Sequence, residues 1–312
     1  MLAELRGQLE RGVVGQREFL DGLLVGLLAD GHVLIEGVPG LAKTRAVNLL
    51  ARACEVSFKR LQFTPDLLPA DVLGTRVYNQ AAGTFETVRG PIFAHFILAD
   101  EINRAPAKVQ SALLETMQER QVTLGPDTLP VAAPFLVFAT QNPVEQEGTY
   151  PLPEAQLDRF LMKLRVTYPA QEDEDAIVRM VIDEVRLPPV ERVLDAEGVV
   201  ALQAACREVH VEDRVIRYAT ELVATTRDPA RHGLELAPYV EYGASPRGSI
   251  ALVRAARAAA LMDGRDAVHP DDVKRFAPPV LRHRIVRSYY AHAEKVSADH
   301  LVDEILAAVP AP

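Results

Sequence analysis

The feature that most constrains this chain is a glycine-containing loop, Gly37-Val38-Pro39-Gly40-Leu41-Ala42-Lys43-Thr44. It follows a short apolar run, His32 to Glu36, and precedes a helical pattern that extends to about Ala53. In such a strand–loop–helix context, backbone N–H groups at the helix start point at an anion, and the helix dipole adds positive potential. Lys43 can then reach the β- and γ-phosphates of a nucleotide, and the Thr44 hydroxyl can hold Mg²⁺. The loop therefore predicts a phosphate-binding site.

One position departs from the usual phosphate-loop pattern, which has glycine immediately before the lysine. Ala42 stands there, and a methyl group is the smallest possible departure. Because residues with a side chain avoid positive φ, alanine is acceptable at this position if φ is negative there. The alternative interpretation of the loop is a glycine-rich turn with a solvated lysine.

Apolar runs and helical patterns alternate in the first half of the chain, which is typical of βα units and a mostly parallel sheet. The predicted strands are His32 to Glu36, Val56 to Leu61, Phe96 to Ala99, Phe135 to Thr140 and Leu164 to Thr167. After Tyr168-Pro169 the pattern is acidic and helical, with helices predicted at 172–185, 196–209, 212–226, 246–262, 271–282 and from 298. We therefore predict an α/β core over residues 1–168 and an all-α domain over residues 169–312.

Carboxylate and amide side chains follow two of the predicted strands. Asp100 and Glu101 end the run Phe96 to Ala99, at the strand end where α/β proteins bind ligands. Asp100 is suited to hold Mg²⁺ through its water shell, and Glu101 to orient and deprotonate an attacking water. Asn142 follows the next strand and can hydrogen-bond a γ-phosphate or the lytic water. The alternatives are an ordinary acidic pair at a loop start and an Asn that caps a turn before proline.

Two arginines are further candidates. Arg159 lies in a predicted short helix, Pro153 to Met162, whose buried stripe is formed by Leu157, Phe160 and Leu161. Spacing alone favours a surface salt bridge for Arg159.

Arg247 falls in the first turn of the predicted helix 246–262, after the good N-cap Ser245 and Pro246. A cation there opposes the helix dipole by ~0.3–1 kcal/mol. This position indicates an anion nearby, such as a phosphate brought by a neighbouring domain, or else a tolerated surface arginine.

Two segments interrupt the βα alternation, and both read as β-hairpins inserted into the core: Gly74 to Arg89 and Gln121 to Val131. They are either functional loops or surface decoration.

Composition excludes several classes of protein. Thirty-four Lys and Arg against 43 Asp and Glu give a net charge of −9, which argues against nucleic acid as the main partner. The two cysteines, Cys54 and Cys206, are too few for a disulfide framework or a four-ligand zinc site and fit a reducing cytoplasm. We find no signal-peptide pattern and no apolar stretch of about 18 residues, so we expect neither export nor a membrane segment.

With these residues placed, the chain resembles the AAA+ ATPases and, within them, the MoxR family. The segments that carry the resemblance are GVPGLAKT, ILADEINRAPAKVQSALLETMQE, FATQNPVEQEGTYPLPEAQLDRF and GASPRGS, with Val13-Val14-Gly15-Gln16 before the core. Together they cover most of residues 10–168 and one short segment in the helical half. The departure from glycine at Ala42 is similar to the loop sequence of MoxR proteins themselves.

The resemblance implies a P-loop NTPase core with two inserted hairpins, followed by a helical lid, and it implies roles for individual residues. These are Lys43 and Thr44 as the Walker A pair, Asp100 and Glu101 as the Walker B pair, Asn142 as sensor 1, Arg159 as the finger that reaches a neighbouring subunit's γ-phosphate, Arg247 as sensor 2, and Val14 and Gly15 against the adenine. The hairpins would be the helix-2 insert and the pre-sensor-1 hairpin, which face a central pore or substrate.

The resemblance also implies a function: Mg²⁺-dependent ATP hydrolysis by a cytoplasmic ring, a hexamer, that drives chaperone-like remodelling, maturation or activation of a partner. Partners of MoxR ATPases often contain von Willebrand factor A domains. The alternatives are a helicase-like nucleic-acid motor, an ATPase subunit of a metal chelatase and a non-hydrolysing nucleotide switch. The acidic balance argues against the first of these, and the presence of Glu101 and Arg159 argues against the last.

Overall fold

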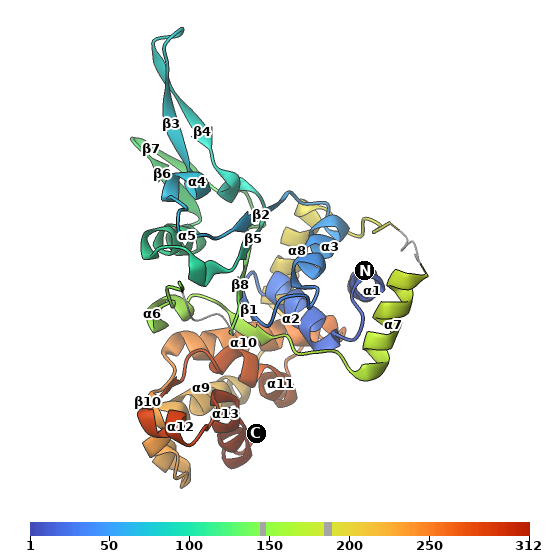
Figure 1. Ribbon diagram of the computed structural model, residues 1–312. Coiled ribbons are helices and arrows are strands. Elements are labelled where there is room, and N and C mark those ends of the chain that lie inside the picture. The colour runs from blue at the N-terminus through green and yellow to red at the C-terminus, as the bar shows by residue number, and fades with distance from the viewer. Residues whose placement is uncertain (144–147, 184–188) are drawn as a thin grey trace. The chain divides into compact units, whose positions relative to one another are not determined.

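The computed structural model describes residues 1–143, 148–183 and 189–312 and divides into two compact units (Figure 1). The first contains Met1–Leu24, His32–Leu152 and Leu164–Ala201, and the second contains Val25–Gly31, Pro153–Lys163 and Leu202–Pro312. The chain thus passes between the units several times. The division into domains 1–168 and 169–312 stays a prediction.

A five-stranded sheet forms the centre of the α/β core. Its order is β2-β5-β8-β1-β9, and the pairs β2–β5, β5–β8 and β8–β1 are parallel. The strands are β1 (Val33–Glu36), β2 (Phe58–Gln62), β5 (Phe96–Asp100), β8 (Leu136–Gln141) and β9 (Met162–Arg165). All five residues of β5 are buried, as expected for a central parallel strand covered on both faces. The α/β prediction is therefore confirmed, with the strand ends shifted by one or two residues.

Helices cover the sheet of the first unit. In Figure 1, α3 (Lys43–Ala53) and α5 (Ala107–Glu119) lie on opposite faces of it. The other helices that begin in this unit are α1 (Leu2–Gly12), α2 (Arg17–Leu28), α4 (Pro69–Leu73), α7 (Gln171–Ile182) and α8 (Ala196–Glu208), with short turns η1 (Pro91–Phe93) and η2 (Ile102–Arg104). The last residues of α2 and α8 belong to the second unit. The helix predicted over residues 172–185 corresponds to α7, and its last two positions lie outside the described residues.

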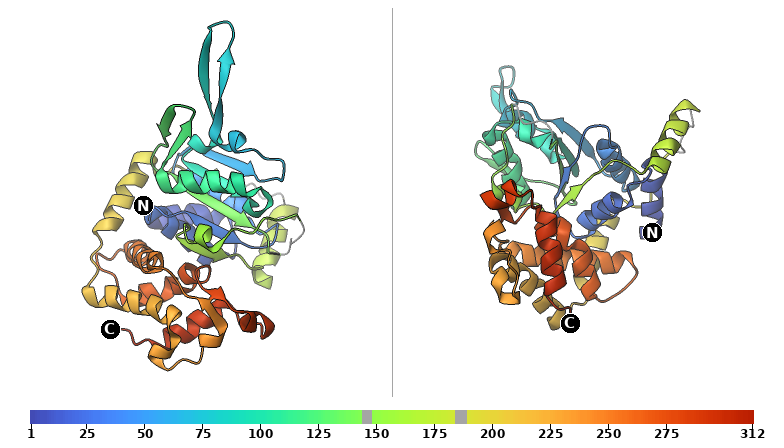
Figure 2. Two further views of the ribbon diagram at one scale, coloured as in Figure 1. Left: turned by 90° about the vertical axis from the view of Figure 1, so that its left-hand side faces the viewer. Right: turned by 60° about the horizontal axis from the view of Figure 1, so that its bottom comes forward.

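Both predicted hairpins are present in the first unit. The first pairs β3 (Gly74–Asn79) with β4 (Thr84–Arg89), and the second pairs β6 (Gln121–Leu124) with β7 (Asp127–Pro130). The β3–β4 hairpin extends well away from the sheet (Figures 1 and 2).

The second unit is mainly helical. Helix α10 (Pro246–Met262) packs on α9 (Asp213–Arg227) and α11 (Pro270–Leu281), and α13 (Ala298–Ala308) packs on α9 and α11. The buried alanines of α10 present only methyl groups, so neighbouring helices can approach closely. These helices confirm the all-α prediction apart from one short strand pair, β10 (Val240–Tyr242) with β11 (Val286–Arg287), which the sequence analysis did not predict. The remaining short elements are η3 (Pro229–His232), η4 (Ala237–Tyr239) and α12 (Tyr289–Ala293).

The helix predicted from Pro153 to Met162 is wrong in its length. Only α6 (Glu154–Leu157) forms, and Met162 begins β9. The carbonyls of Asp158, Phe160 and Leu161 accept hydrogen bonds from the guanidinium of Arg284 instead of from helical N–H groups. Tertiary hydrogen bonds, rather than a further helical turn, therefore hold the segment after α6. Of the predicted stripe, Phe160 and Leu161 are buried.

Across the described part of the chain, no helix combines the length and the apolar character needed to cross a bilayer.

Candidate nucleotide-binding site

The predicted phosphate loop connects β1 to α3 and has two glycines with different requirements. An added Cβ at Gly37 would lie 2.7 Å from the carbonyl oxygen of Val166, so neighbouring backbone excludes a side chain there. Gly40 has φ of +89°, and an added Cβ would meet nothing within 4 Å. Gly40 is therefore required by its left-handed backbone rather than by space, and the room beside it remains open to a ligand.

Ala42 has φ of +55°, so the condition of a negative φ at this position is not met. This residue is the N-cap of α3, and its carbonyl accepts from Ala46 N at 2.9 Å, so the loop must reverse direction immediately before Lys43. An L-residue in this conformation costs roughly 1–2 kcal/mol, and backbone strain of this kind is common at ligand sites. The tight turn before the helix, rather than the residue type, decides the conformation.

Lys43 begins α3, and its ammonium donates a hydrogen bond to the carbonyl of Gly37. Burial lowers the pKa of Lys43, whereas the carboxylates of Asp100 and Glu101 act on it in the opposite direction. The cation thus lies within electrostatic reach of both acids. Thr44 follows it, half-buried, in the first turn of the helix.

Asp100 ends β5 and is buried, and both of its oxygens accept hydrogen bonds. Thr140 donates its hydroxyl to Oδ1 at 2.6 Å, and Arg60 donates Nε and Nη2 to Oδ2 at 2.9 and 2.6 Å. These partners come from β8 and β2, the strands on either side of β5. The sequence analysis missed both Arg60 and Thr140, which only the strand order brings beside Asp100.

Glu101 follows in the left-handed region, with φ of +58°. Its backbone N–H donates to the Thr140 hydroxyl at 2.9 Å, so one threonine joins both acidic residues. Its carboxylate accepts from Gln62 Nε2 at 2.8 Å and forms an ion pair with Arg104 at 3.2 Å. The acid is thereby held in one orientation at the carboxyl edge of the sheet.

Asn142 comes directly after β8 and is buried. The parallel register aligns the ends of β1 and β8, Glu36 opposite Gln141, so the phosphate loop and Asn142 leave the same edge of the sheet. The structure therefore brings Lys43, Thr44, the acidic pair and Asn142 to one edge, within the first unit.

The two candidate arginines belong to the second unit. Arg159 is half-buried between α6 and β9, and Arg247 is exposed in the first turn of α10. Ser245 caps that helix by accepting from the Arg247 N–H at 3.1 Å, as predicted. The roles of both arginines toward a nucleotide stay predictions.

A cavity of about 340 Å³ lies beside the phosphate loop in the first unit. Val14 lines it, while Gly15 follows at φ of +71°, where an added Cβ would lie 2.4 Å from Asp173 Oδ2. The other lining residues are Gly12, Val13, Gln16, Gly40, Leu41, Ala42, Arg45, Pro169, Ile177 and Met180. Ile177 and Met180 come from α7, a helix that the sequence analysis did not connect with the site. This apolar wall next to phosphate-binding N–H groups suits a purine base.

The chain is similar to known proteins. Residues 32–162 match the family described as "ATPase family associated with various cellular activities (AAA)", and residues 235–305 match "AAA lid domain". The chain is 48% identical to "Chaperone MoxR1" of Mycobacterium tuberculosis, covering 98% of this chain and 81% of that protein. It is 35% identical to "Protein MoxR" of Paracoccus denitrificans, covering 96% and 93%.

A solved structure of a putative ATPase from Cytophaga hutchinsonii superposes with a TM-score of 0.92 at 49% identity, covering 99% of this chain and 94% of that one. The likeness spans both the sheet with its phosphate loop and the helical unit. On its sequence, its fold and these relatives, the chain belongs to the MoxR family of AAA+ ATPases and is an ATPase.

Proposed function

We propose that this protein is a Mg²⁺-dependent ATPase that assembles into a ring and drives chaperone-like remodelling, maturation or activation of a partner protein. The observation that carries the catalytic part is the arrangement at the carboxyl edge of the sheet. There Thr140 joins Asp100 to Glu101, and the Lys43 ammonium lies within reach of both carboxylates.

ATP binding falls to the phosphate loop and the cavity beside it. Residues 37–44 supply backbone N–H groups at the start of α3, and Lys43 supplies a cation for the β- and γ-phosphates. Val14 and Gly15, with the α7 side chains Ile177 and Met180, hold the adenine. The ammonium that we assign to the phosphates donates a hydrogen bond to the Gly37 carbonyl, at the first residue of the loop.

The residues present also fit a magnesium ion. Thr44 and Asp100 offer hydroxyl and carboxylate oxygens, the hard donors that Mg²⁺ prefers alongside phosphate oxygens and water. When bound, Mg²⁺ neutralises charge that develops on the phosphates. Arg60 and Thr140 donate hydrogen bonds to the two oxygens of Asp100 and so orient its carboxyl group.

Hydrolysis requires a positioned base, and we assign that role to Glu101. Gln62 and Arg104 fix its carboxylate, and Thr140 fixes its backbone. Asn142, as sensor 1, holds the γ-phosphate or the attacking water by its amide. Arg247, as sensor 2, contributes a further cation toward the phosphates.

Arg159 completes the site of a neighbouring subunit, as the family resemblance implies. An arginine supplied in trans is worth about 10³–10⁵ in rate where it acts as the catalytic finger. A finger that serves the next subunit requires head-to-tail contacts, which close into a ring when the rotation fits. We propose a hexamer located in the cytoplasm.

The β3–β4 hairpin supports a protein partner. Val77, Tyr78, Phe85 and Val88 are exposed on it, while Arg76 lies over the ring of Phe85 at 5.2 Å. Arg89 lies over Phe93 in the same way. The hairpin thus presents apolar side chains and engages its own cations, which suits protein contact better than phosphate contact. "Chaperone MoxR1" gives the same indication by its name, and a partner with a von Willebrand factor A domain fits the family.

The test compares ATP affinity and ATP turnover of Lys43→Ala, Glu101→Gln and Arg159→Ala with those of the parent, across protein concentration. Lys43→Ala should lose ATP affinity, while Glu101→Gln should bind ATP and lose turnover. Arg159→Ala should bind ATP, assemble and lose turnover, and the parent's specific activity should rise with concentration as rings form. Parent-level turnover in Glu101→Gln, or a concentration-independent active monomer, would contradict the proposal.

A further inference from the structure

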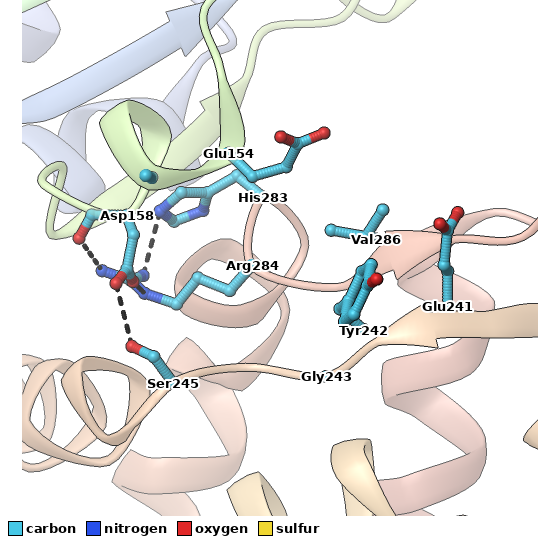
Figure 3. A pocket seen from close by; sticks show the side chains of 10 residues that line it. Glu154, Asp158, Glu241, Tyr242, Gly243, Ser245, His283, Arg284 and Val286 are labelled. Atoms are coloured by element: carbon cyan, nitrogen blue, oxygen red, sulfur yellow. Dashed lines mark hydrogen bonds and ion pairs between the residues drawn. The ribbon is translucent and has the colours of Figure 1, made fainter.

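A hydrogen-bonded cluster in the second unit surrounds Arg284, a residue that the proposed chemistry leaves unused (Figure 3). We infer that Arg284 is a positioning residue for Arg159: it fixes the segment that carries the finger and, through Asp158 and Ser245, joins that segment to the helix that carries Arg247. The inference rests on the roles proposed above for these two arginines.

The first argument is which atoms Arg284 contacts. Its Nη2 donates to the carbonyl of Phe160 at 2.6 Å and to that of Asp158 at 3.3 Å. Its Nη1 donates to the carbonyl of Leu161 at 3.1 Å. These acceptors lie on both sides of residue 159, so the guanidinium holds the backbone of Arg159 before and after its Cα.

The second argument is the link to α10. Asp158 accepts from Arg284 Nε at its Oδ1 and from the Ser245 hydroxyl at its Oδ2, both at 2.8 Å. The same Ser245 oxygen accepts from the Arg247 N–H. A chain of three hydrogen bonds therefore runs from Arg284 to the first turn of α10. Figure 3 shows the side chain of Asp158 between those of Arg284 and Ser245.

The third argument is the number of donors. Nε and the two Nη atoms of Arg284 carry five N–H groups. They lie against Asp158 Oδ1, the carbonyls of Asp158, Phe160, Leu161 and Val280, and Nε2 of His283, so each nitrogen of the guanidinium has a partner. A lysine has three donors on one atom and cannot match acceptors spread around a plane. Only arginine satisfies this arrangement.

The fourth argument is burial beside a cavity. The Arg284 side chain is 3% exposed, while a space of about 570 Å³, lined by Asp158, Ser245 and Arg284, lies next to it. On the side that faces this cavity, packing of side chains cannot hold the segment that carries Arg159. The buried charge and its hydrogen bonds must therefore fix it there.

The test compares Arg284→Lys with Arg265→Lys as a matched control. Arg265 also forms a two-point ion pair in the second unit, with Asp272 at 2.6 and 2.8 Å. Among the described residues, it makes no hydrogen bond or ion pair with Arg159 or Arg247. Arg284→Lys should lower kcat by about tenfold to a hundredfold, because a small misplacement of a catalytic group costs that much. ATP affinity and assembly should stay at the parent's values, and Arg265→Lys should keep the parent's kcat.

A double variant separates positioning from general loosening. If Arg284 acts through Arg159, Arg159→Ala/Arg284→Lys should turn over ATP no more slowly than Arg159→Ala alone. Multiplied losses would overturn the inference, as would parent-like kcat in a folded Arg284→Lys.

Ser245→Ala provides a second path should Arg284→Lys not fold. It removes the link to Asp158 and a helix cap, whereas Ser297→Ala removes a cap alone, at α13. Ser245→Ala should lower kcat severalfold while Ser297→Ala leaves it unchanged; equal kcat in the two would overturn the inference. An Arg159→Ala variant that keeps the parent's turnover would instead mark failure of the proposed finger, and the inference would fall with it.

Discussion

Two polar clusters of this ATPase are built in different ways. At the edge of the sheet, Thr140 lies beside Asp100 because β8 and β5 are parallel neighbours, and a neutral hydroxyl joins the two acids. In the second unit, Arg284 reaches Asp158 across 126 residues and holds a loop by buried charge. A sheet positions chemistry by its register, whereas a loop between a short helix and a strand depends on one side chain. The second cluster should therefore be the more fragile of the two.

The largest expected effect comes from removing the charge partner in the second unit. Asp158→Ala leaves the buried guanidinium of Arg284 without its carboxylate and should cost about 3–5 kcal/mol of unfolding free energy. Urea denaturation followed by circular dichroism measures it. Asp299→Ala, which breaks the more exposed pair with Arg282, is the control and should cost much less. Equal losses would contradict the difference drawn here.

The matching change at the sheet edge is Thr140→Val. Valine keeps the shape but leaves Asp100 Oδ1 and the Glu101 N–H without their shared partner, at a cost of about 1–3 kcal/mol. ATP turnover should fall as well, since Glu101 loses its backbone anchor. Thr123→Val, at an exposed position of β6, is a control and should leave both quantities at the parent's values. If Thr140→Val lost as much unfolding free energy as Asp158→Ala, the two clusters would not differ in fragility.

The pH dependence of stability should separate the two polar clusters further. Burial, and then the Arg284 charge, hold the pKa of His283 well below its usual 6.5. Below about pH 6.5 the unfolded chain therefore binds a proton that the folded chain does not. The unfolding free energy should consequently decrease as the pH is lowered, by up to about 1.4 kcal/mol per pH unit. Above that pH, His283 contributes no slope.

The variant that checks this is His283→Gln. Unfolding of both proteins should be measured between pH 5 and pH 8, and the variant should show a shallower loss of stability at the acid end. Identical slopes in the two proteins would mean that another group binds the proton.

The smallest expected effect concerns Ala42. Ala42→Gly relieves a left-handed backbone but loosens the unfolded chain, so its stability should stay within about 1 kcal/mol of the parent's. Ala42→Val should cost roughly 1–2 kcal/mol, because a β-branched side chain suits positive φ poorly. Thermal unfolding and ATP turnover of both variants test this. A stabilised Ala42→Val would show that the loop adopts a different backbone.

Prediction from sequence went furthest where local pattern and register coincide. The strands, the two hairpins and α10 follow from apolar periodicity and from turn and cap residues. Lys43 follows from the glycine-containing loop, and Asp100 and Asn142 follow from their places at the ends of buried strands. The length of the α6 helix was predicted wrongly: local spacing gave no sign that Arg284, more than a hundred positions away, donates to the carbonyls of the segment that follows α6. Arg60 and Gln62 gave no signal, since their importance depends on β2 lying next to β5.

By itself, then, the sequence determined the alternation of strands and helices, the phosphate loop and the residues at strand ends, because these depend on neighbours within a few positions. Only the tertiary structure decided the backbone of Ala42 and Glu101, the partners of Asp100 and the clamp around Arg159. Those depend on which distant donors and acceptors meet, and burial makes each unmatched polar group costly enough to fix the outcome.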